Sequence, residues 1–396
     1  MDFSDDQRTF IQKVYPTVNN EDLLEFRIPP NVKANLCLSN VMLRFMVKIP
    51  QTSRTIVIPE NLLGAKQFSS LEIRINGDAV NRRNCSNEYF LASYFQNITN
   101  FSVDYACSSG ISFGLFDTMQ MIREDFTENS DIAHRVAEGR SGVNEDHVYE
   151  IVMPIDSSIF SCNGNLPTKT AIDISFERSN SKFSIITNKE VEGLPEILTL
   201  EDPFLLVPFT NDYKMHQYEQ EDISRPIKLK YDDYVINRFN IPKDSPNARL
   251  SNVLSGPLPT KLFWGIMDLS SYAGSYDHSS SHFTRASLKK MTLYLDGNVV
   301  SGFPILTSEN AVSIPYTRFL MNTNRYLNCY SCTTLSPRDF KHYHFLNSST
   351  LAKDSAGSLT FDFDFEKTPN KDLVLITCGI FERTIEIDNF RNFKIK

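Results

Sequence analysis

The feature that most constrains the fold is an internal duplication of three short segments. Residues 26–29 resemble residues 239–242, residues 71–80 resemble 291–300, and residues 172–179 resemble 361–368. The three pairs keep the same order in both halves of the chain, and a helical pattern follows the second pair each time. That pair also shares an Asn-Gly or Asp-Gly dipeptide, which favours a type I′ turn with positive φ at both central residues. Strand-like segments with Gly turns can match by chance, but the shared order favours a repeated structural unit.

Alternation of apolar and polar residues predicts strands over much of the chain. The alternation is visible in residues 41–49, 71–75 and 148–152, and it is strict in residues 361–366. In that last segment Phe361, Phe363 and Phe365 alternate with Asp362, Asp364 and Glu366. Because successive side chains of a strand point to opposite faces, we expect the three Phe to face a core and the three acids to face solvent.

Helical periodicity is confined to two segments. It appears in Leu91, Tyr94, Phe95 and Ile98, and again in Tyr316, Phe319 and Leu320. Ser86 and Ser313 are the predicted N-caps, and Pro315 lies in the first turn of the second helix, where a missing N–H is tolerated. The predicted fold class is therefore all-β, with short connecting helices.

The spacing of the repeats predicts two tandem jelly-roll β-sandwiches, residues 1–212 and 213–396, with a boundary within residues 208–226. The second pair of repeats is 220 residues apart and the third pair is 189 apart, so the first half carries 31 more residues between these segments. We assign the excess to an inserted polar loop near residues 116–147, because insertions are tolerated on surfaces.

Composition excludes several classes of protein. Of the 396 residues, 41% are hydrophobic and 22% are charged, which is typical of a folded chain that is neither disordered nor membranous. The net charge of −8 argues against a surface that coats nucleic acid, so nucleic-acid contact is not expected as the main role. The acidic first residues predict no signal peptide, and no apolar run is long enough to predict a membrane segment. Seven irregularly spaced Cys predict no disulfide framework, which favours a reducing compartment.

Motifs for catalysis are weak. Residues 110–114 match G-x-S-x-G with Ser112 in the nucleophile position, but no α/β alternation surrounds them, and a glycine-flanked loop or strand is favoured. The acids Asp362, Asp364 and Glu366 share one strand face, where neighbours are ~6.7 Å apart, a separation within the range that glycoside hydrolysis uses. A solvated strand face explains them more simply, and it also explains Asp173 and Glu177 in the matching strand. We therefore predict no catalytic residue.

Motifs for metal and nucleic-acid binding are also weak. Cys329 and Cys332, with His342 and His344, offer four zinc ligands, but two buried thiols are the simpler interpretation. His278 and His282 have the spacing of two ligands on one helix face, but the three serines between them favour a solvated loop. Two basic clusters, Arg82-Arg83 and Arg391 with Lys394 and Lys396, are interpreted as solvated surface. We predict no metal and no other cofactor.

The order of several segments in the second half carries a resemblance to a known family. Trp264 lies in the apolar run 261–267, a Ser/Tyr-rich loop and the strand and turn of residues 291–300 follow, and residues 373–381 lead into 385–392. This order resembles the double jelly-roll major capsid proteins, and within them the Polinton/Maverick (adintovirus-like) group. The inserted loop near residues 116–147 matches no motif of that family.

The resemblance implies a structural role without enzymatic activity. Such proteins form homotrimers with a pseudo-hexagonal outline that tile an icosahedral shell, with a minor (penton) capsid protein as a further partner. It also implies location in the virion, after synthesis inside the host cell and without secretion. The alternative that the residues leave open is a two-jelly-roll protein that binds or hydrolyses glycans.

Overall fold

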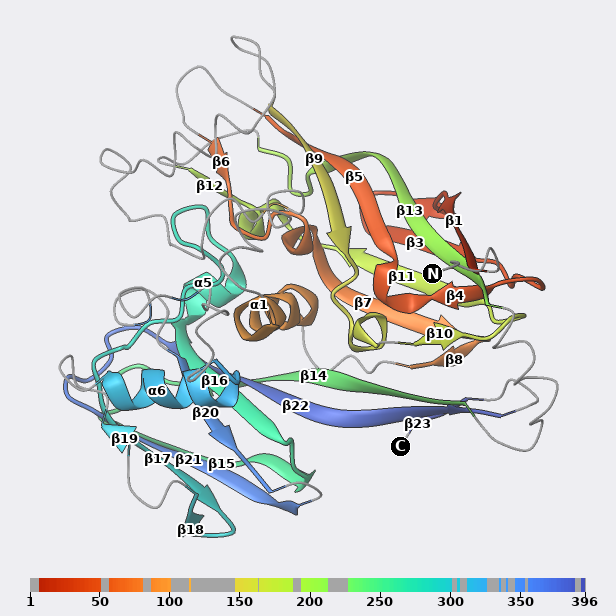
Figure 1. The fold of residues 1–396 in the computed structure, drawn as a ribbon. Coiled ribbons are helices and arrows are strands. Elements are labelled where there is room, and N and C mark those ends of the chain that lie inside the picture. Colours follow the sequence, from red (N-terminus) through yellow and green to blue (C-terminus); the bar gives the residue numbers. More distant parts are fainter. Residues whose placement is uncertain are drawn as a thin grey trace.

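The structure is a computed structural model of a mostly antiparallel β protein (Figure 1), as the alternation predicts. It describes residues 7–50, 57–80, 87–100, 114, 147–162, 164–187, 194–212, 227–300, 305–306, 312–325, 335, 340, 346–352, 355–388 and 393–395. Strands dominate this part of the chain, and the short helices lie in the connections between them.

The first half of the chain forms one sandwich. One of its sheets contains β1 (Gln7–Val14), β13 (Thr199–Asp212), β4 (Asn35–Cys37), β5 (Met42–Ile49), β9 (His147–Pro154) and β10 (Asn165–Leu166). The facing sheet contains β2 (Val18–Asn19), β3 (Leu23–Ile28), β11 (Ile172–Arg178), β7 (Phe68–Ile75) and β8 (Asp78–Ala79). A separate pair joins β6 (Val57–Pro59) to β12 (Ile185–Thr187). The sheets pack through aromatic side chains, since the rings of Phe45 and Phe68 lie 5.8 Å apart across the core.

The second half forms another sandwich. One sheet contains β14 (Ile227–Ile241), β22 (Leu373–Ile387), β16 (Lys261–Asp268), β20 (Leu346–Thr350) and β23 (Phe393–Ile395). The facing sheet contains β15 (Asn247–Pro257), β21 (Ala356–Phe365), β17 (Leu288–Leu295), β18 (Asn298–Val299) and β19 (Ile305–Leu306). The ring of Trp264 lies 5.4 Å from that of Phe361 and connects the two sheets.

The helices fall between strands. In the described ranges the 3-10 helices are η1 (Leu38–Asn40), η2 (Ala65–Gln67), η4 (Ser158–Ser161) and η5 (Ser181–Phe183), and the α-helices are α1 (Glu88–Asn100), α5 (Leu269–Ala273) and α6 (Ser313–Asn322). The two predicted helices are therefore confirmed as α1 and α6, and Pro315 lies in the first turn of α6. The predicted cap Ser313 is wrong, because Val312 occupies the N-cap position and no side chain caps this helix. Ser86 lies outside the described residues.

The two sandwiches share one strand order, which is that of a jelly roll. In the first, β1 pairs with β13, β13 with β5, and β5 with β9, while in the second β14 pairs with β22, β22 with β16, and β16 with β20. The facing sheets run β3-β11-β7-β8 and β15-β21-β17-β18. Two of the three repeats that the sequence shows therefore occupy equivalent strands, β7 with β17 and β11 with β21.

The turns of the second repeat have the predicted geometry. Asn76 and Gly77 have φ of 51° and 94°, and Asp296 and Gly297 have φ of 48° and 83°. Both central residues of each turn are thus in the left-handed region, as a type I′ hairpin requires. A Cβ added at either glycine would meet nothing within 4 Å, so glycine serves the backbone conformation there rather than a close contact.

The first repeat is not a structural equivalent. Residues 26–28 end β3, whose counterpart in the second sandwich is β15, whereas residues 239–241 end β14, whose counterpart is β1. The likeness is therefore a coincidence of two strand ends that each precede a Pro. A four-residue apolar pattern indicates that a strand is half-buried, but it does not indicate which other strand this strand pairs with.

The faces of β21 agree with the alternation. Phe361, Phe363 and Phe365 are buried, while Asp362 and Asp364 are half-buried and Glu366, directly after the strand, is exposed. Among the described residues, no sheet of either sandwich contains strands from both sides of residues 213–226, which lie outside the described chain. The predicted insertion near residues 116–147 also lies outside it, except for His147, which begins β9.

Candidate functional site

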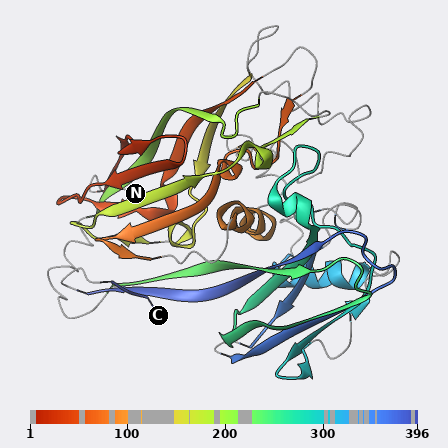
Figure 2. The same ribbon diagram turned by 180° about the vertical axis from the view of Figure 1, so that it is seen from behind.

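A buried ion pair, a charged cavity and an acid with a raised pKa all lie at or near the contact between the two sandwiches. The helix α1 lies between the sandwiches in both views of the ribbon (Figure 1, Figure 2). Ten of its thirteen residues are buried. A helix that is buried on nearly all sides must be covered by more than one partner, because a surface helix buries only one stripe. The first sandwich supplies one cover and the second sandwich supplies the other.

Aromatic contacts and hydrogen bonds join α1 to the second sandwich. The ring of Phe283 lies 5.3 Å from the ring of Tyr94 and 5.7 Å from that of Phe95. At the end of the helix, the Asn100 side-chain amide donates to the Tyr234 hydroxyl over 3.1 Å. At its start, the Asn87 amide donates to the carbonyl of Tyr272 over 3.2 Å. Such fully buried aromatic packing orients the helix as well as stabilising it.

A buried ion pair lies at the same contact. The Lys66 ammonium lies 2.7 Å from Glu60 Oε2, and the side chains of both residues are almost completely buried. Residues of the second sandwich complete this cluster: Ser279 Oγ donates to Glu60 Oε2 over 2.8 Å, the Ser280 backbone N–H donates to Glu60 Oε1 over 3.0 Å, and Lys66 Nζ donates to Ser281 Oγ over 2.8 Å. We refer to these five residues as the serine-loop cluster.

The serine-loop cluster corrects a prediction. Residues 278–282 form no helix, as expected, but the loop is not solvated, because Ser279, Ser280 and Ser281 are all buried. His278 and His282 are only half-buried. A run of serines is typical of solvated loops in sequence, and only an acceptor from another part of the chain makes its burial favourable. Here that acceptor is Glu60, about 220 residues away in sequence.

The long strands β14 and β22 extend from the second sandwich under the first. They pair over their whole length, from Ile227 opposite Ile387 to Ile241 opposite Leu373. β16 pairs with β22 only as far as Ile380, so the remainder of the two strands forms a ribbon beyond the second sandwich. The strand β14 contacts η4 and α1 of the first sandwich, and Figure 1 shows α1 beside the long strands β14 and β22. Its Tyr231 is only 7% exposed as a result.

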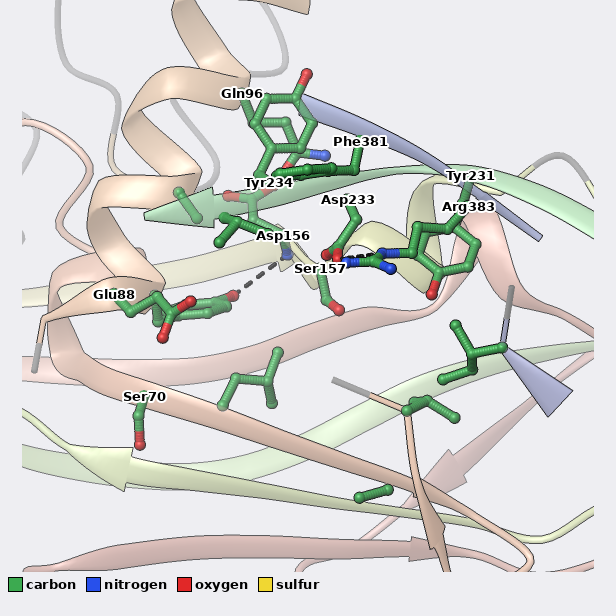
Figure 3. A pocket seen from close by; sticks show the side chains of 17 residues that line it. Ser70, Glu88, Gln96, Asp156, Ser157, Tyr231, Asp233, Tyr234, Phe381 and Arg383 are labelled. Carbon is green, nitrogen blue, oxygen red and sulfur yellow. Dashed lines mark hydrogen bonds and ion pairs between the residues drawn. The ribbon is translucent and has the colours of Figure 1, made fainter. Parts of the chain in front are cut away.

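A cavity of about 400 Å³ lies where α1, β7, β14 and β22 meet (Figure 3). Its polar lining includes Glu88, Asp156, Asp233 and Arg383. Arg383 Nε donates to Asp233 Oδ2 over 3.0 Å across the two strands. Asp233 and Arg383 therefore partly neutralise each other, and the cavity lies beside a hydrophobic core that continues from one sandwich into the other.

Asp156 is the most perturbed acid at this contact. It lies after β9, its Oδ2 accepts a hydrogen bond from Ser93 Oγ of α1, and its backbone N–H donates to the Tyr89 hydroxyl over 3.3 Å. Burial raises the pKa of Asp156 to about 7, although the Ser93 bond acts in the opposite direction. Burial likewise raises the pKa of Tyr231, which also lines the cavity, to about 12. Sequence reasoning missed Asp156, because no local pattern marks it as buried.

The acids considered for catalysis have ordinary cross-strand partners. Asp364 lies 3.7 Å from Lys290, and Asp173 lies 3.7 Å from Arg27. Glu177 accepts a hydrogen bond from Ser70 Oγ over 2.6 Å. None of these acids lines the cavity of Figure 3. Asp364, Asp173 and Glu177 thus each interact with a residue on a neighbouring strand of their own sheet.

Several other candidates lie outside the described residues. These are Ser112, Cys329, Cys332, His342, His344, Arg82, Arg83, Arg391 and Lys396. Lys394 is described and lies exposed on β23. Within the described ranges no group of three His, Cys, Asp or Glu side chains is arranged to hold a metal ion. In the same part of the chain, no helix combines the length and the apolar character that crossing a membrane requires.

Comparison with known proteins identifies the fold. No family model and no curated protein matches the sequence. Solved structures match over almost the whole chain. A chain of the Sputnik virophage has a TM-score of 0.62 at 11% identity, covering 98% of this chain and 88% of that chain. The mavirus major capsid protein has a TM-score of 0.59 at 10% identity, covering 98% and 90%.

The PBCV-1 virus capsid gives a similar match. Its TM-score is 0.57 at 9% identity, and the match covers 99% of this chain and 98% of that chain. Because the matches extend over both sandwiches, the fold of the whole chain is the double jelly roll of viral major capsid proteins. Identities near 10% establish this fold and nothing finer.

Proposed function

We propose that this chain is a structural capsid protein whose homotrimers have a pseudo-hexagonal outline and tile an icosahedral shell. The observation that carries the proposal is the presence of two jelly rolls with the same strand order in one chain. Three copies then supply six similar sandwiches, which can surround one axis in a closed ring, and cyclic closure is an ordinary symmetry for homo-oligomers. The likeness in fold to capsid proteins over the full chain supports the same role.

The finer parts of the proposal follow from this role. We place the two units at residues 1–212 and 213–396, and the protein in the virion, made inside the host cell without secretion. A minor (penton) capsid protein is the expected second partner, because a hexagonal tile cannot occupy the vertices of an icosahedron. Membership of the Polinton/Maverick group rests on the sequence resemblance alone.

The role is structural rather than enzymatic. The alternative of a glycan-binding or glycan-hydrolysing protein is not favoured, because Asp364 and Asp173 are engaged with basic partners on solvent-facing strands. The charged cavity of Figure 3 is lined by residues of both sandwiches, so we assign its charged groups to the contact between the sandwiches rather than to a substrate site.

Light scattering coupled to size exclusion tests the proposal directly. The full chain has a mass of 45.3 kDa, and we expect a native mass of three times that value or a larger particle that electron microscopy resolves as a shell. A protein that stays monomeric over the accessible concentration range, or a monomer that binds or cleaves glycans, would contradict the capsid role.

A further inference from the structure

Within one chain, the two sandwiches contact each other through two different surfaces. The first sandwich contributes η4, which follows β9, and α1, which precedes it, and the second contributes its edge strand β14. Among the described strands, β14 pairs only with β22, so this edge is the side that the first sandwich covers. The surface formed by α1 and η4, next to β9 in the first sandwich, therefore contacts β14, which is the first strand of the second sandwich.

In the described part of the chain, one further surface of each kind is not covered by the other sandwich. The counterpart of β14 in the first sandwich is β1, which likewise pairs only with the last strand of its sandwich among the described strands. The counterpart of the β9 side in the second sandwich is β20 with α6, which precedes β20 and packs on it. In Figure 1 and Figure 2, β1 and α6 lie at opposite ends of the molecule, with α1 between them.

Equivalent positions on the two edge strands differ sharply in burial. Leu206 and Ile380 are the last residues of β13 and β22 that pair with β5 and β16. Three residues beyond each of them, Phe209 lies opposite Phe10 and Arg383 lies opposite Tyr231. Tyr231 is 7% exposed beneath the first sandwich, whereas Phe10 is 46% exposed. The edge strand of the first sandwich thus carries a large aromatic side chain at the position that is covered in the second.

The two helices show the same contrast. α1 is buried on nearly all sides, whereas only Pro315 and Phe319 of the ten residues of α6 are buried. Ile314 and Met321 of α6 are 51% and 53% exposed. Together with Phe10, Ile11 and Tyr15 on and directly after β1, they make five of the eight large hydrophobic side chains that are exposed in the described part of the chain. Within the described residues, apolar exposure is therefore concentrated on the two surfaces that the other sandwich of the same chain does not cover.

We infer that the α6 face of one copy binds the β1 edge of a second copy of this chain, in repetition of the contact that α1 and η4 make with β14. The inference rests on the proposed function and names the surfaces that would close the ring. The contact is heterologous, because each copy presents two different surfaces, and such contacts form a ring when their rotation closes. An exposed edge strand that is covered in the assembly would also be protected from pairing with other chains.

Two variants and their mixture test this inference. Ile11→Asp places a charge on the β1 edge and Met321→Asp places one on the α6 face, and both positions are exposed, so folding should be retained. The control is Val32→Asp, which changes a side chain that is 65% exposed but lies on neither surface. We expect each variant alone to associate at least about tenfold more weakly than wild type, because charge in the centre of an apolar contact is unfavourable, and the control to associate normally.

The mixture separates a head-to-tail contact from a symmetric one. Ile11→Asp chains keep an intact α6 face and Met321→Asp chains keep an intact β1 edge, so an equimolar mixture should give a species of two chains and stop there. A mixture that stays monomeric at concentrations where wild type assembles would overturn the inference. So would wild-type assembly by either variant alone.

Photocrosslinking provides a second measurement that needs no loss of assembly. Benzoylphenylalanine at position 11 should crosslink to peptides of α6 from another copy, and mass spectrometry identifies the site. If the wild type assembles but crosslinks form only elsewhere, the inference fails while the capsid role stands. If the wild type never assembles, the proposed function fails as well.

Discussion

Lys66 Nζ and Glu60 Oε2 lie 2.7 Å apart in a site from which solvent is almost excluded, and the hydrogen bonds that complete the pair come from a serine loop of the other sandwich. The ion pair belongs to the first sandwich, and the docked second sandwich supplies three hydrogen bonds that help to compensate its desolvation. A buried pair of this kind adds little net stability, yet it strongly disfavours any arrangement that leaves one charge unpaired. We therefore interpret it as a device that specifies how the two jelly rolls dock.

Removal of one partner should be strongly destabilising. Lys66→Met leaves the Glu60 carboxylate buried without its cation, and we expect the free energy of unfolding to fall by about 3–5 kcal/mol. The control is Arg27→Met, which removes the 3.7 Å pair with Asp173, whose partners are 65% and 40% exposed. That change should cost less than about 1 kcal/mol. Urea unfolding followed by fluorescence measures both, and equal losses would contradict the role assigned to the pair.

Asp156 should make stability depend on pH. Its pKa is raised by burial to about 7, above the value near 3.9 of an unfolded chain. Between about pH 4 and pH 7 the folded chain keeps a proton that the unfolded chain releases, so this group's contribution to the unfolding free energy falls as pH rises, by up to about 4 kcal/mol. Asp156→Asn removes the dependence, and the variant should gain stability relative to wild type across this range.

Ser93 provides the control for this dependence. Its hydroxyl stabilises the charged form of Asp156, so Ser93→Ala should raise the pKa of Asp156 further and steepen the loss of stability with pH. Thermal unfolding at several pH values measures all three proteins. A stability difference between wild type and Asp156→Asn that stays constant from pH 4 to pH 7 would show that Asp156 is ionised throughout.

Phe283 should control how tightly α1 is held between the sandwiches. Phe283→Ala removes its contacts with Tyr94 and Phe95, and truncation of a buried Phe costs about 3–5 kcal/mol. We expect faster amide hydrogen exchange in α1. Phe363→Ala removes an equally buried ring from the core of the second sandwich and is the matched control. If both variants change exchange in α1 equally, the local role of Phe283 is refuted.

The type I′ turns should tolerate Asn but not Ala at their second position. Gly297 has φ of 83° and open space around it, so Gly297→Ala meets no clash and costs only the backbone strain of the left-handed region, about 1–2 kcal/mol. Gly297→Asn should cost less, since Asn enters that region more readily. Thermal unfolding of the two variants gives the comparison, and an equal loss would mean that the turn conformation is not what glycine supplies.

Local patterns were sufficient for much of the fold. The alternation of Phe361, Phe363 and Phe365 with acids predicted which face of β21 is buried, because the period of a strand is a local property. The Asn76-Gly77 and Asp296-Gly297 dipeptides predicted their turn type, because positive φ is restricted by the residue itself. Both helices were predicted from the spacing of their apolar residues.

Strand pairing and the burial of polar side chains depend on tertiary contacts that local patterns do not show. The repeat at residues 26–29 and 239–242 failed because the same apolar pattern fits any half-buried strand end, and only the sheet assigns its partner. The serine pattern predicts a solvated loop and no local pattern marks Asp156, because burial of a polar group depends on a donor or acceptor from a distant segment. By itself the sequence determined the strands, their faces and their turns, which depend on neighbouring residues. Tertiary structure alone decided how the two sandwiches meet, because that contact joins side chains whose proximity no local pattern encodes.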